Sequence, residues 1–199
     1  METTAIGESI REQIRESREV KKAILDDRDM LELIEAVSRR CVDVYRAGGK
    51  VLLAGNGGSA ADAQHIAGEL VSRFYFDRPG LACIALSTDT SILTAIGNDF
   101  GISRVFARQV EANGRSGDLF VGISTSGNSE NVVEALKAAK DKGLFTVGLT
   151  GADGGRMEEY CDYCIKVPSK DTPRIQESHI MIGHVICAIV EKSLFRKDS

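Results

Sequence analysis

The sequence has no tryptophan and only three prolines in 199 residues, and it contains neither an internal repeat nor a low-complexity tract. Nothing in it marks a linker between domains, so we expect a single domain. No apolar run approaches the roughly 18–20 residues that a membrane-spanning helix needs. The N-terminal residues are of mixed charge and lack the apolar stretch of a signal peptide. These absences predict a cytoplasmic protein without a membrane partner.

A surplus of positive charge is also missing. The chain has 25 Lys and Arg residues against 29 Asp and Glu residues, which gives a formal net charge of −4 at pH 7. Such a balance provides no general attraction to nucleic acid, so we expect no nucleic-acid partner. The 43% hydrophobic and 27% charged content lies near the average of globular proteins, which excludes wholesale disorder.

The five cysteines are odd in number and scattered, which is a poor basis for a disulfide framework. Cys161 and Cys164 have the C-x-x-C spacing of some redox and zinc sites. A structural zinc site would need a second such pair, and a thioredoxin-like motif should open a helix after a strand. Because Cys164 instead begins the apolar run 164–167, we interpret both as structural cysteines with reduced thiols.

The first 47 residues are predicted to form a helical extension ahead of the main domain. Its first helix carries a narrow apolar stripe in a strongly charged background, formed by Ile6, Ile10, Ile14, Val20 and Ile24. A stripe that narrow is more typical of an oligomer interface than of a helix that faces its own core. Asp29 and Glu32 then have the spacing of a capping box and predict the start of a second helix, which ends at Gly48 and Gly49.

From residue 50 onward, short apolar runs alternate with helical patterns. The predicted strands are 51–54, 81–86, 119–123, 146–149 and 163–167, and the predicted helices are 60–74, 90–96, 105–110, 131–142 and 173–195. Continuous apolar strands separated by helices indicate right-handed βαβ units in a parallel sheet covered on both faces. We therefore predict an α/β fold in residues 48–199, with an open, doubly wound five-stranded sheet. Ligands of such sheets bind beyond the carboxyl ends of the strands.

The loop after the first predicted strand, residues 55–60, contains the G-x-G-x-x-A pattern of dinucleotide-binding proteins. Dinucleotide binding would also require an acidic residue about 20 positions further on. Asp89 comes much later and fits a helix N-cap equally well. The pattern alone is therefore weak support for a dinucleotide.

The loop after the third predicted strand is a stronger candidate for binding phosphate. It contains four hydroxyl residues directly before a helix: Ser124, Thr125, Ser126 and Ser129. Hydroxyls and backbone N–H groups at a helix N-terminus favour a dianion. The alternative, a serine-rich turn with an N-cap, explains one or two hydroxyls but not four. No lysine of the Walker A type is present, so a small phosphorylated ligand that spans both loops is favoured over a nucleoside triphosphate.

All three histidines lie in two short segments. His65 and Glu69 stand four residues apart on the predicted helix after the first loop, which places both side chains on one face. His179 and His184 lie on the last predicted helix. Such a concentration favours acid/base or metal chemistry, although a surface ion pair and a buried, hydrogen-bonded histidine are the alternatives.

Four segments in order, 51–65, 97–101, 122–129 and 174–179, resemble the phosphoheptose isomerase family of sugar-isomerase (SIS) domains. The resemblance covers nearly the whole chain. It implies a five-stranded parallel sheet of flavodoxin-like type, a homotetramer and one zinc ion per subunit. It also implies interconversion of sedoheptulose 7-phosphate and D-glycero-D-manno-heptose 7-phosphate through an enediol. This is the first step toward the activated heptose of bacterial surface polysaccharides such as lipopolysaccharide.

The resemblance also implies roles for individual residues. Glu69 and His184 would be the catalytic base and acid. The zinc ligands would be His65, Glu69, Gln176 and His184. The substrate contacts would be Asn56, Gly57, Gly58, Glu69, Asn98, Asp99, Ser124, Thr125, Ser126, Ser129 and Gln176. Some relatives carry Asp where this chain has Pro173, so the resemblance does not carry over a role for an acidic group at that position.

The position of Gln176 raises a geometric question. Gln176 and His184 are eight residues apart, about 12 Å along a regular helix, whereas zinc ligands lie only about 2 Å from the ion. Both side chains would have to reach toward each other, or Gln176 would lie on an irregular first turn after Pro173, or a neighbouring subunit would contribute. The sequence leaves these alternatives open.

Two other functions compete with the isomerase. One branch of the fold is an initiator-associating factor that binds the replication initiator DnaA and lacks key catalytic side chains. The presence of His65, Glu69 and His184 together favours the enzyme. A sugar-phosphate sensor would need an output domain, for which the chain has no length.

Overall fold

The computed structural model describes residues 3–195 of the chain, and all five of its strands there are parallel. The strand order is β2-β1-β3-β4-β5. The strands are β1 Val51–Gly55, β2 Cys83–Ala85, β3 Leu119–Ile123, β4 Phe145–Thr150 and β5 Tyr163–Lys166. This order confirms the predicted doubly wound sheet, since the chain reverses direction between β2 and β3 on the two sides of β1.

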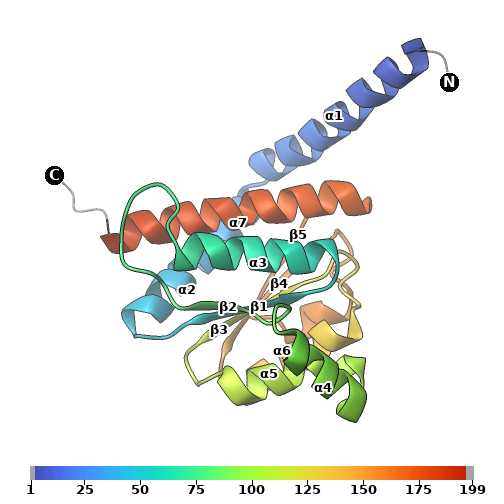
Figure 1. Ribbon diagram of the computed structural model, residues 1–199. Coiled ribbons are helices and arrows are strands. Elements are labelled where there is room, and N and C mark those ends of the chain that lie inside the picture. Colours follow the sequence, from blue (N-terminus) through green and yellow to red (C-terminus); the bar gives the residue numbers. More distant parts are fainter. Residues whose placement is uncertain (1–2, 196–199) are drawn as a thin grey trace.

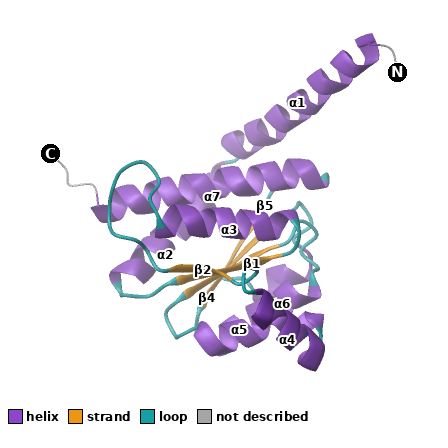
Figure 2. Ribbon diagram, viewed as in Figure 1, coloured by secondary structure: helices purple, strands orange, loops and turns teal. Residues whose placement is uncertain are grey.

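Helices cover both faces of the sheet (Figures 1 and 2). One face is covered by α2 Arg28–Arg46, α3 Gly58–Val71 and α7 Thr172–Phe195. The other is covered by α4 Thr90–Phe100, α5 Val105–Asn113 and α6 Glu130–Asp141, together with the short 3-10 segments Ile102–Arg104 and Gly155–Tyr160. Every residue of β1 and β3 is buried, which explains their continuous apolar runs.

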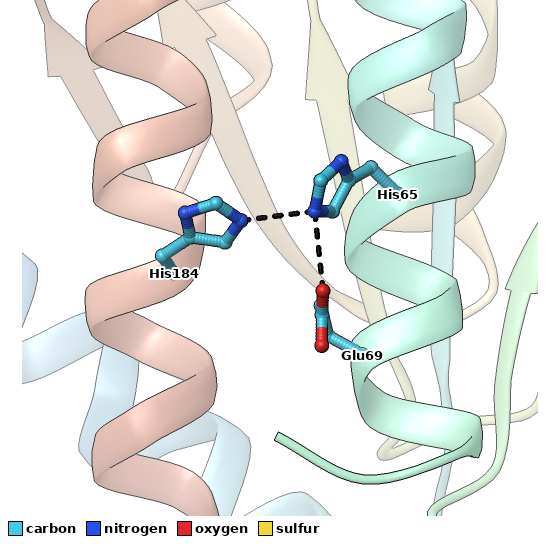
Figure 3. Close-up of side chains that lie close together, drawn as sticks. All are labelled: His65, Glu69 and His184. Carbon is cyan, nitrogen blue, oxygen red and sulfur yellow. Dashed lines mark hydrogen bonds and ion pairs between the residues drawn. The ribbon is translucent and has the colours of Figure 1, made fainter. Parts of the chain in front are cut away.

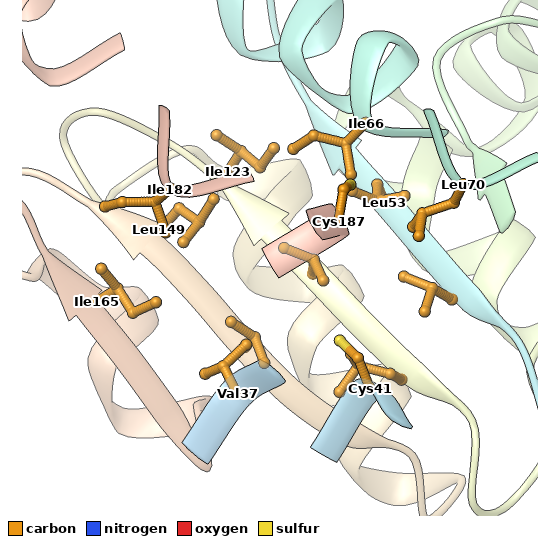
Figure 4. Close-up of a cluster of buried hydrophobic side chains, with 14 of the residues drawn as sticks. Val37, Cys41, Leu53, Ile66, Leu70, Ile123, Leu149, Ile165, Ile182 and Cys187 are labelled. Atoms are coloured by element: carbon orange, nitrogen blue, oxygen red, sulfur yellow. The ribbon is translucent and has the colours of Figure 1, made fainter. Parts of the chain in front are cut away.

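The larger core cluster lies between the sheet and the helices α2, α3 and α7. Figure 4 shows Val37 and Cys41 of α2 and Cys187 of α7 among side chains from the strands. Burial raises the pKa of Cys41 and of Cys187 to about 12, so these thiols are poor nucleophiles. Cys161 and Cys164 lie beside Gly148 of β4 and open no helix, in agreement with their interpretation as structural residues.

The start of α2 differs from the prediction. Asp27, not Asp29, is the N-cap, and its side chain accepts a hydrogen bond of 3.0 Å from the backbone N–H of Met30. Glu32 pairs with Arg28 at 2.8 Å instead of closing a capping box. The reason is that α1 Thr3–Asp26 runs to within one residue of α2, which leaves Asp27 as the only residue between the two helices.

The apolar stripe of α1 divides into two parts. Ile24 is buried in the chain's own core and Val20 packs against it, so this end of the stripe is not free for another subunit. Ile6, Ile10 and Ile14 are 46%, 56% and 65% exposed. In Figure 1 this end of α1 projects away from the rest of the domain.

Helix α7 is long and apolar enough to meet a length and composition test for a membrane span, which the sequence prediction had not anticipated. Its position explains its composition, because it packs against α2 and α3 and contributes Ile175, Ile182, Cys187 and Val190 to the core. It is a core helix of the domain.

His179 of α7 is fully buried, and its Nε2 lies 3.1 Å from the carbonyl oxygen of Thr150. Burial lowers the pKa of His179 to about 4, although the hydrogen bond to Thr150 opposes this shift. This histidine fits the structural alternative named above.

The buried His179 predicts a loss of stability in mild acid. Because its pKa is about 4 in the folded protein and 6.5 ordinarily, the unfolded chain takes up a proton first as the pH falls. The stability that this group contributes is complete above pH 6.5 and is lost toward pH 4, with about 2 kcal/mol gone by pH 5. Urea unfolding at pH 7.5 and 5.0 should show a smaller loss for His179→Gln than for the wild type. Equal losses would contradict the prediction.

Candidate active site at two loops and on helices α3 and α7

The first loop joins β1 to α3. Gly57 has a φ of +56°, which favours glycine, and α3 begins at the next residue. A Cβ at Gly58 would collide with the side chain of Gln176, so Gln176 of α7 lies directly over this loop. Asn56 exchanges two hydrogen bonds of 2.9 Å with Asn131 at the start of α6. The two loops predicted to bind ligand are therefore tied together.

The second loop, between β3 and α6, gathers its serine hydroxyls at the helix N-terminus. Ser124 Oγ lies 2.8 Å from Ser129 Oγ and 3.4 Å from Ser126 Oγ. Ser129 holds the N-cap position of α6, yet its side chain makes no capping hydrogen bond. The serine-rich-turn alternative is therefore weakened, because the hydroxyl that should cap the helix faces the other hydroxyls. Such an arrangement suits a phosphate group.

A cavity of about 290 Å³ opens beside this loop. Thr125 and Ser126 line it together with residues that the sequence had not singled out, above all Ser169 and Lys170 after β5. Lys170 forms an exposed ion pair of 3.0 Å with Asp153, which also lines the cavity. In the sequence, only the short polar loop after the fifth predicted strand indicated that Ser169 and Lys170 could line a cavity.

His65, Glu69 and His184 converge from α3 and α7 (Figure 3). His65 Nε2 lies 3.1 Å from Glu69 Oε1 and 3.0 Å from His184 Nε2. The two imidazole rings are tilted, with centroids 4.9 Å apart. The helices come this close because residue 183 is glycine, since a Cβ there would lie 2.7 Å from Ile66 Cδ1. Three of the predicted site residues are thus brought together.

The chemistry of this cluster suits a cation. A single hydrogen on His65 Nε2 serves only one of its two close contacts, so lone pairs of nitrogen and oxygen converge on the same space. One ligand atom from each residue lies within 4.8 Å of the others. Tetrahedral zinc, with ligand distances of about 2.0–2.2 Å, separates its ligand atoms by about 3.3 Å, close to the two contacts above. The three residues fit a metal ion.

Gln176 is not part of this cluster as the structure places it. Helix α7 is regular from Thr172, so the alternative of an irregular first turn is wrong. The Gln176 side chain contacts Gly58 at the first loop, two helical turns from His184. Its role as a metal ligand stays a prediction.

Asn98 and Asp99 were expected on a loop but lie on the last turn of α4, which extends to Phe100. Both are exposed, and Asn98 Nδ2 donates to Asp99 Oδ1 at 2.8 Å. Among the described residues, neither is hydrogen-bonded to another predicted site residue. The predicted helix ended at Ile96 because Gly97, Asn98 and Asp99 have low helix propensity.

Asp62 was missed. It precedes His65 by three residues on α3 and so lies on the same face. Its Oδ2 is buried without a hydrogen-bond partner among the described residues, and burial raises its pKa to about 6, against the opposing charge of His65. The i, i+3 spacing to His65 was the available signal.

Comparisons with known proteins agree with this geometry. The SIS domain family model matches residues 14–151. The chain is 64% identical over 191 residues to the phosphoheptose isomerase of Aneurinibacillus thermoaerophilus, covering 96% of each. It is 65% identical over 178 residues to phosphoheptose isomerase 2 of Campylobacter jejuni, covering 89% of each. The solved phosphoheptose isomerase GmhA of Neisseria gonorrhoeae superimposes with a TM-score of 0.88 at 42% identity, over 94% of this chain and 99% of that one.

Proposed function

Because the chain belongs to the phosphoheptose isomerase family of SIS-domain proteins, we propose which of its residues carry out the isomerisation. The chain is an aldose–ketose isomerase that interconverts sedoheptulose 7-phosphate and D-glycero-D-manno-heptose 7-phosphate. The observation that carries our assignment is the convergence of His184 of α7 with His65 and Glu69 of α3, the helix that begins at the first loop. An initiator-binding relative without catalytic side chains would not need this arrangement.

Glu69 is the base and His184 the acid. Aldose–ketose exchange removes a proton from the carbon next to the carbonyl and delivers one to the carbonyl oxygen, through an enediol. The Glu69 side chain is 27% exposed, so its carboxylate is accessible to a sugar carbon. His184 Nε2 is 3.0 Å from His65 Nε2, so both imidazoles lie beside the carboxylate of Glu69.

The phosphate is held away from these groups. Ser124, Ser126 and Ser129 offer their hydroxyls at the N-terminus of α6, where backbone N–H groups and the helix dipole favour an anion. Thr125 lines the adjoining cavity. Asn56, Gly57, Gly58 and Gln176 then lie along the sugar. Asn98 and Asp99 would contact it only if assembly brings α4 to the site of another subunit.

Replacing the base should separate catalysis from binding. In Glu69→Gln the amide cannot take a proton, so kcat should fall by on the order of 10²–10⁴-fold with little change in KM. Turnover is followed by NMR with sedoheptulose 7-phosphate.

Ser124→Ala is the matched comparison. It removes one hydroxyl from the phosphate site, a loss of about 1.5–3 kcal/mol for a hydrogen bond to a charged group, which should raise KM more than it lowers kcat. Near-normal turnover of Glu69→Gln would exclude Glu69 as the base.

Zinc is the ion we propose for His65, Glu69 and His184. Two imidazole nitrogens and one carboxylate oxygen are a common catalytic zinc set, and three protein ligands leave a position for substrate or for Gln176. When bound, the ion would polarise the substrate carbonyl. Atoms bound to the ion would carry no proton, so proton transfer would use the atoms of Glu69 and His184 that do not bind it.

Removing the metal should lower activity, and added zinc should restore it. Metal analysis should find one zinc ion per subunit in the wild type and a loss of bound zinc in His65→Ala. Full activity of metal-free protein would restrict these residues to proton transfer and substrate contacts.

We also propose a homotetramer. Ile6, Ile10 and Ile14 expose an apolar stripe that the described chain leaves uncovered, and α4 buries none of its residues. An apolar stripe of this kind is typical of a helix–helix interface between subunits. We further propose that the enzyme works in the cytoplasm and that its product enters the synthesis of activated heptose for surface polysaccharide.

Light scattering at micromolar concentration should give the mass of a tetramer. The double variant Ile10→Glu, Ile14→Glu should shift it to smaller species, because two carboxylates would be buried at the interface. Arg11→Glu, which changes charge beside the stripe, should leave the mass unchanged. A wild-type monomer would refute the assembly.

A further inference from the structure

A buried ion pair joins the loop after α3 to the C-terminal half of α7. Arg78 Nε lies 3.1 Å from Glu191 Oε1, and the two side chains are 2% and 0% exposed. Removing two charges from water is costly unless further hydrogen bonds satisfy them. In Figure 1 this loop rises from the end of α3 and crosses beside α7 before it returns to β2.

The further hydrogen bonds all go to backbone groups. Glu191 accepts from the N–H groups of Phe74 at 2.8 Å and Tyr75 at 2.7 Å. Arg78 donates to the carbonyl oxygens of Leu70 at 2.6 Å, Glu69 at 2.9 Å and Pro79 at 3.0 Å. Burial favours the neutral acid, but the N–H groups of Tyr75 and Phe74 together with Arg78 outweigh it and hold the pKa of Glu191 below its usual value.

These bonds reach the backbone of the segments that carry or adjoin the proposed catalytic side chains. The carbonyls of Glu69 and Leu70 belong to the last turn of α3, where a helix has no partners of its own, so Arg78 caps the helix that carries His65 and Glu69. Glu191 follows His184 by seven residues, two turns along one face of α7. The ring of Phe74, whose N–H is bound to Glu191, lies 5.7 Å from the ring of His184.

We propose that Arg78 and Glu191 are positioning residues that fix Glu69 of α3 and His184 of α7 at their working separation. The pair acts through the last turn of α3 and through Phe74, and it touches no substrate. This inference rests on the proton-transfer roles proposed for Glu69 and His184. Because the serine cluster on α6 is bound by none of these contacts, the pair should affect turnover without affecting phosphate binding.

The test compares kcat and KM for sedoheptulose 7-phosphate with thermal unfolding. Arg78→Met should lower kcat by on the order of 10–100-fold and change KM by less than about twofold, since a misplacement of about 1 Å at a reacting group has effects of that size. Arg78→Lys keeps the charge but cannot reach three carbonyls at once. Its kcat should therefore lie between those of the wild type and Arg78→Met. The double variant Arg78→Met, Glu191→Met leaves no unpaired buried charge, so it should fold and still show the low kcat.

Lys50→Met is the matched control. Lys50 pairs with the buried Asp118 at 2.6 Å just before β1 and β3, and among the described residues neither is hydrogen-bonded to Arg78, Glu191 or a proposed catalytic side chain. The Lys50→Met substitution should lower the unfolding temperature and leave the kcat of the folded enzyme unchanged. A folded double variant with wild-type kcat, or losses no greater than in Lys50→Met, would overturn the proposal. Normal turnover of Glu69→Gln would instead refute the catalytic assignment on which it rests.

Discussion

The close approach of α3 and α7 is the constraint on which the site depends. Gly183 has no side chain where Ile66 presses against it, and each of these residues adjoins a histidine of the cluster. Glycine inside a helix costs about 1 kcal/mol relative to alanine. The absence of a side chain at Gly183 offsets that cost here, because it lets α3 and α7 approach closely enough for His65 Nε2 and His184 Nε2 to lie 3.0 Å apart.

The parallel sheet supplies the second requirement, which is that phosphate binding and proton transfer occupy different elements. β1 and β3 are adjacent and in register, with Gly55 opposite Ile123, so the loops that follow them start side by side. In the proposed mechanism the serine loop would anchor one end of a sugar phosphate, and the helices α3 and α7 would present Glu69 and His184 to the other end. Binding energy at the phosphate can then orient the reacting carbons.

The sheet and part of the candidate site were predictable from the sequence, because apolar runs and residue spacing indicate them directly. Continuous apolar runs fixed the five strands, and the i, i+4 spacing placed His65 and Glu69 on one face. Contacts between distant segments were not predictable: nothing local in the sequence pairs Arg78 with Glu191 or sets Gln176 against Gly58. Asp27 replaced Asp29 as the cap of α2 because the end of α1, not the capping-box pattern, decided where α2 begins.

The packing of α3 against α7 is tested most directly by Gly183→Ala. The added methyl group would lie 2.7 Å from Cδ1 and 2.8 Å from Cγ1 of Ile66, so either α7 or Ile66, which adjoins His65, must shift. The kcat for sedoheptulose 7-phosphate should therefore fall by on the order of 10–100-fold while KM stays within about twofold. Gly68→Ala is the control, since a Cβ there meets nothing within 4 Å, and it should keep the wild-type kcat. A Gly183→Ala enzyme that turns over as fast as the wild type would contradict the account.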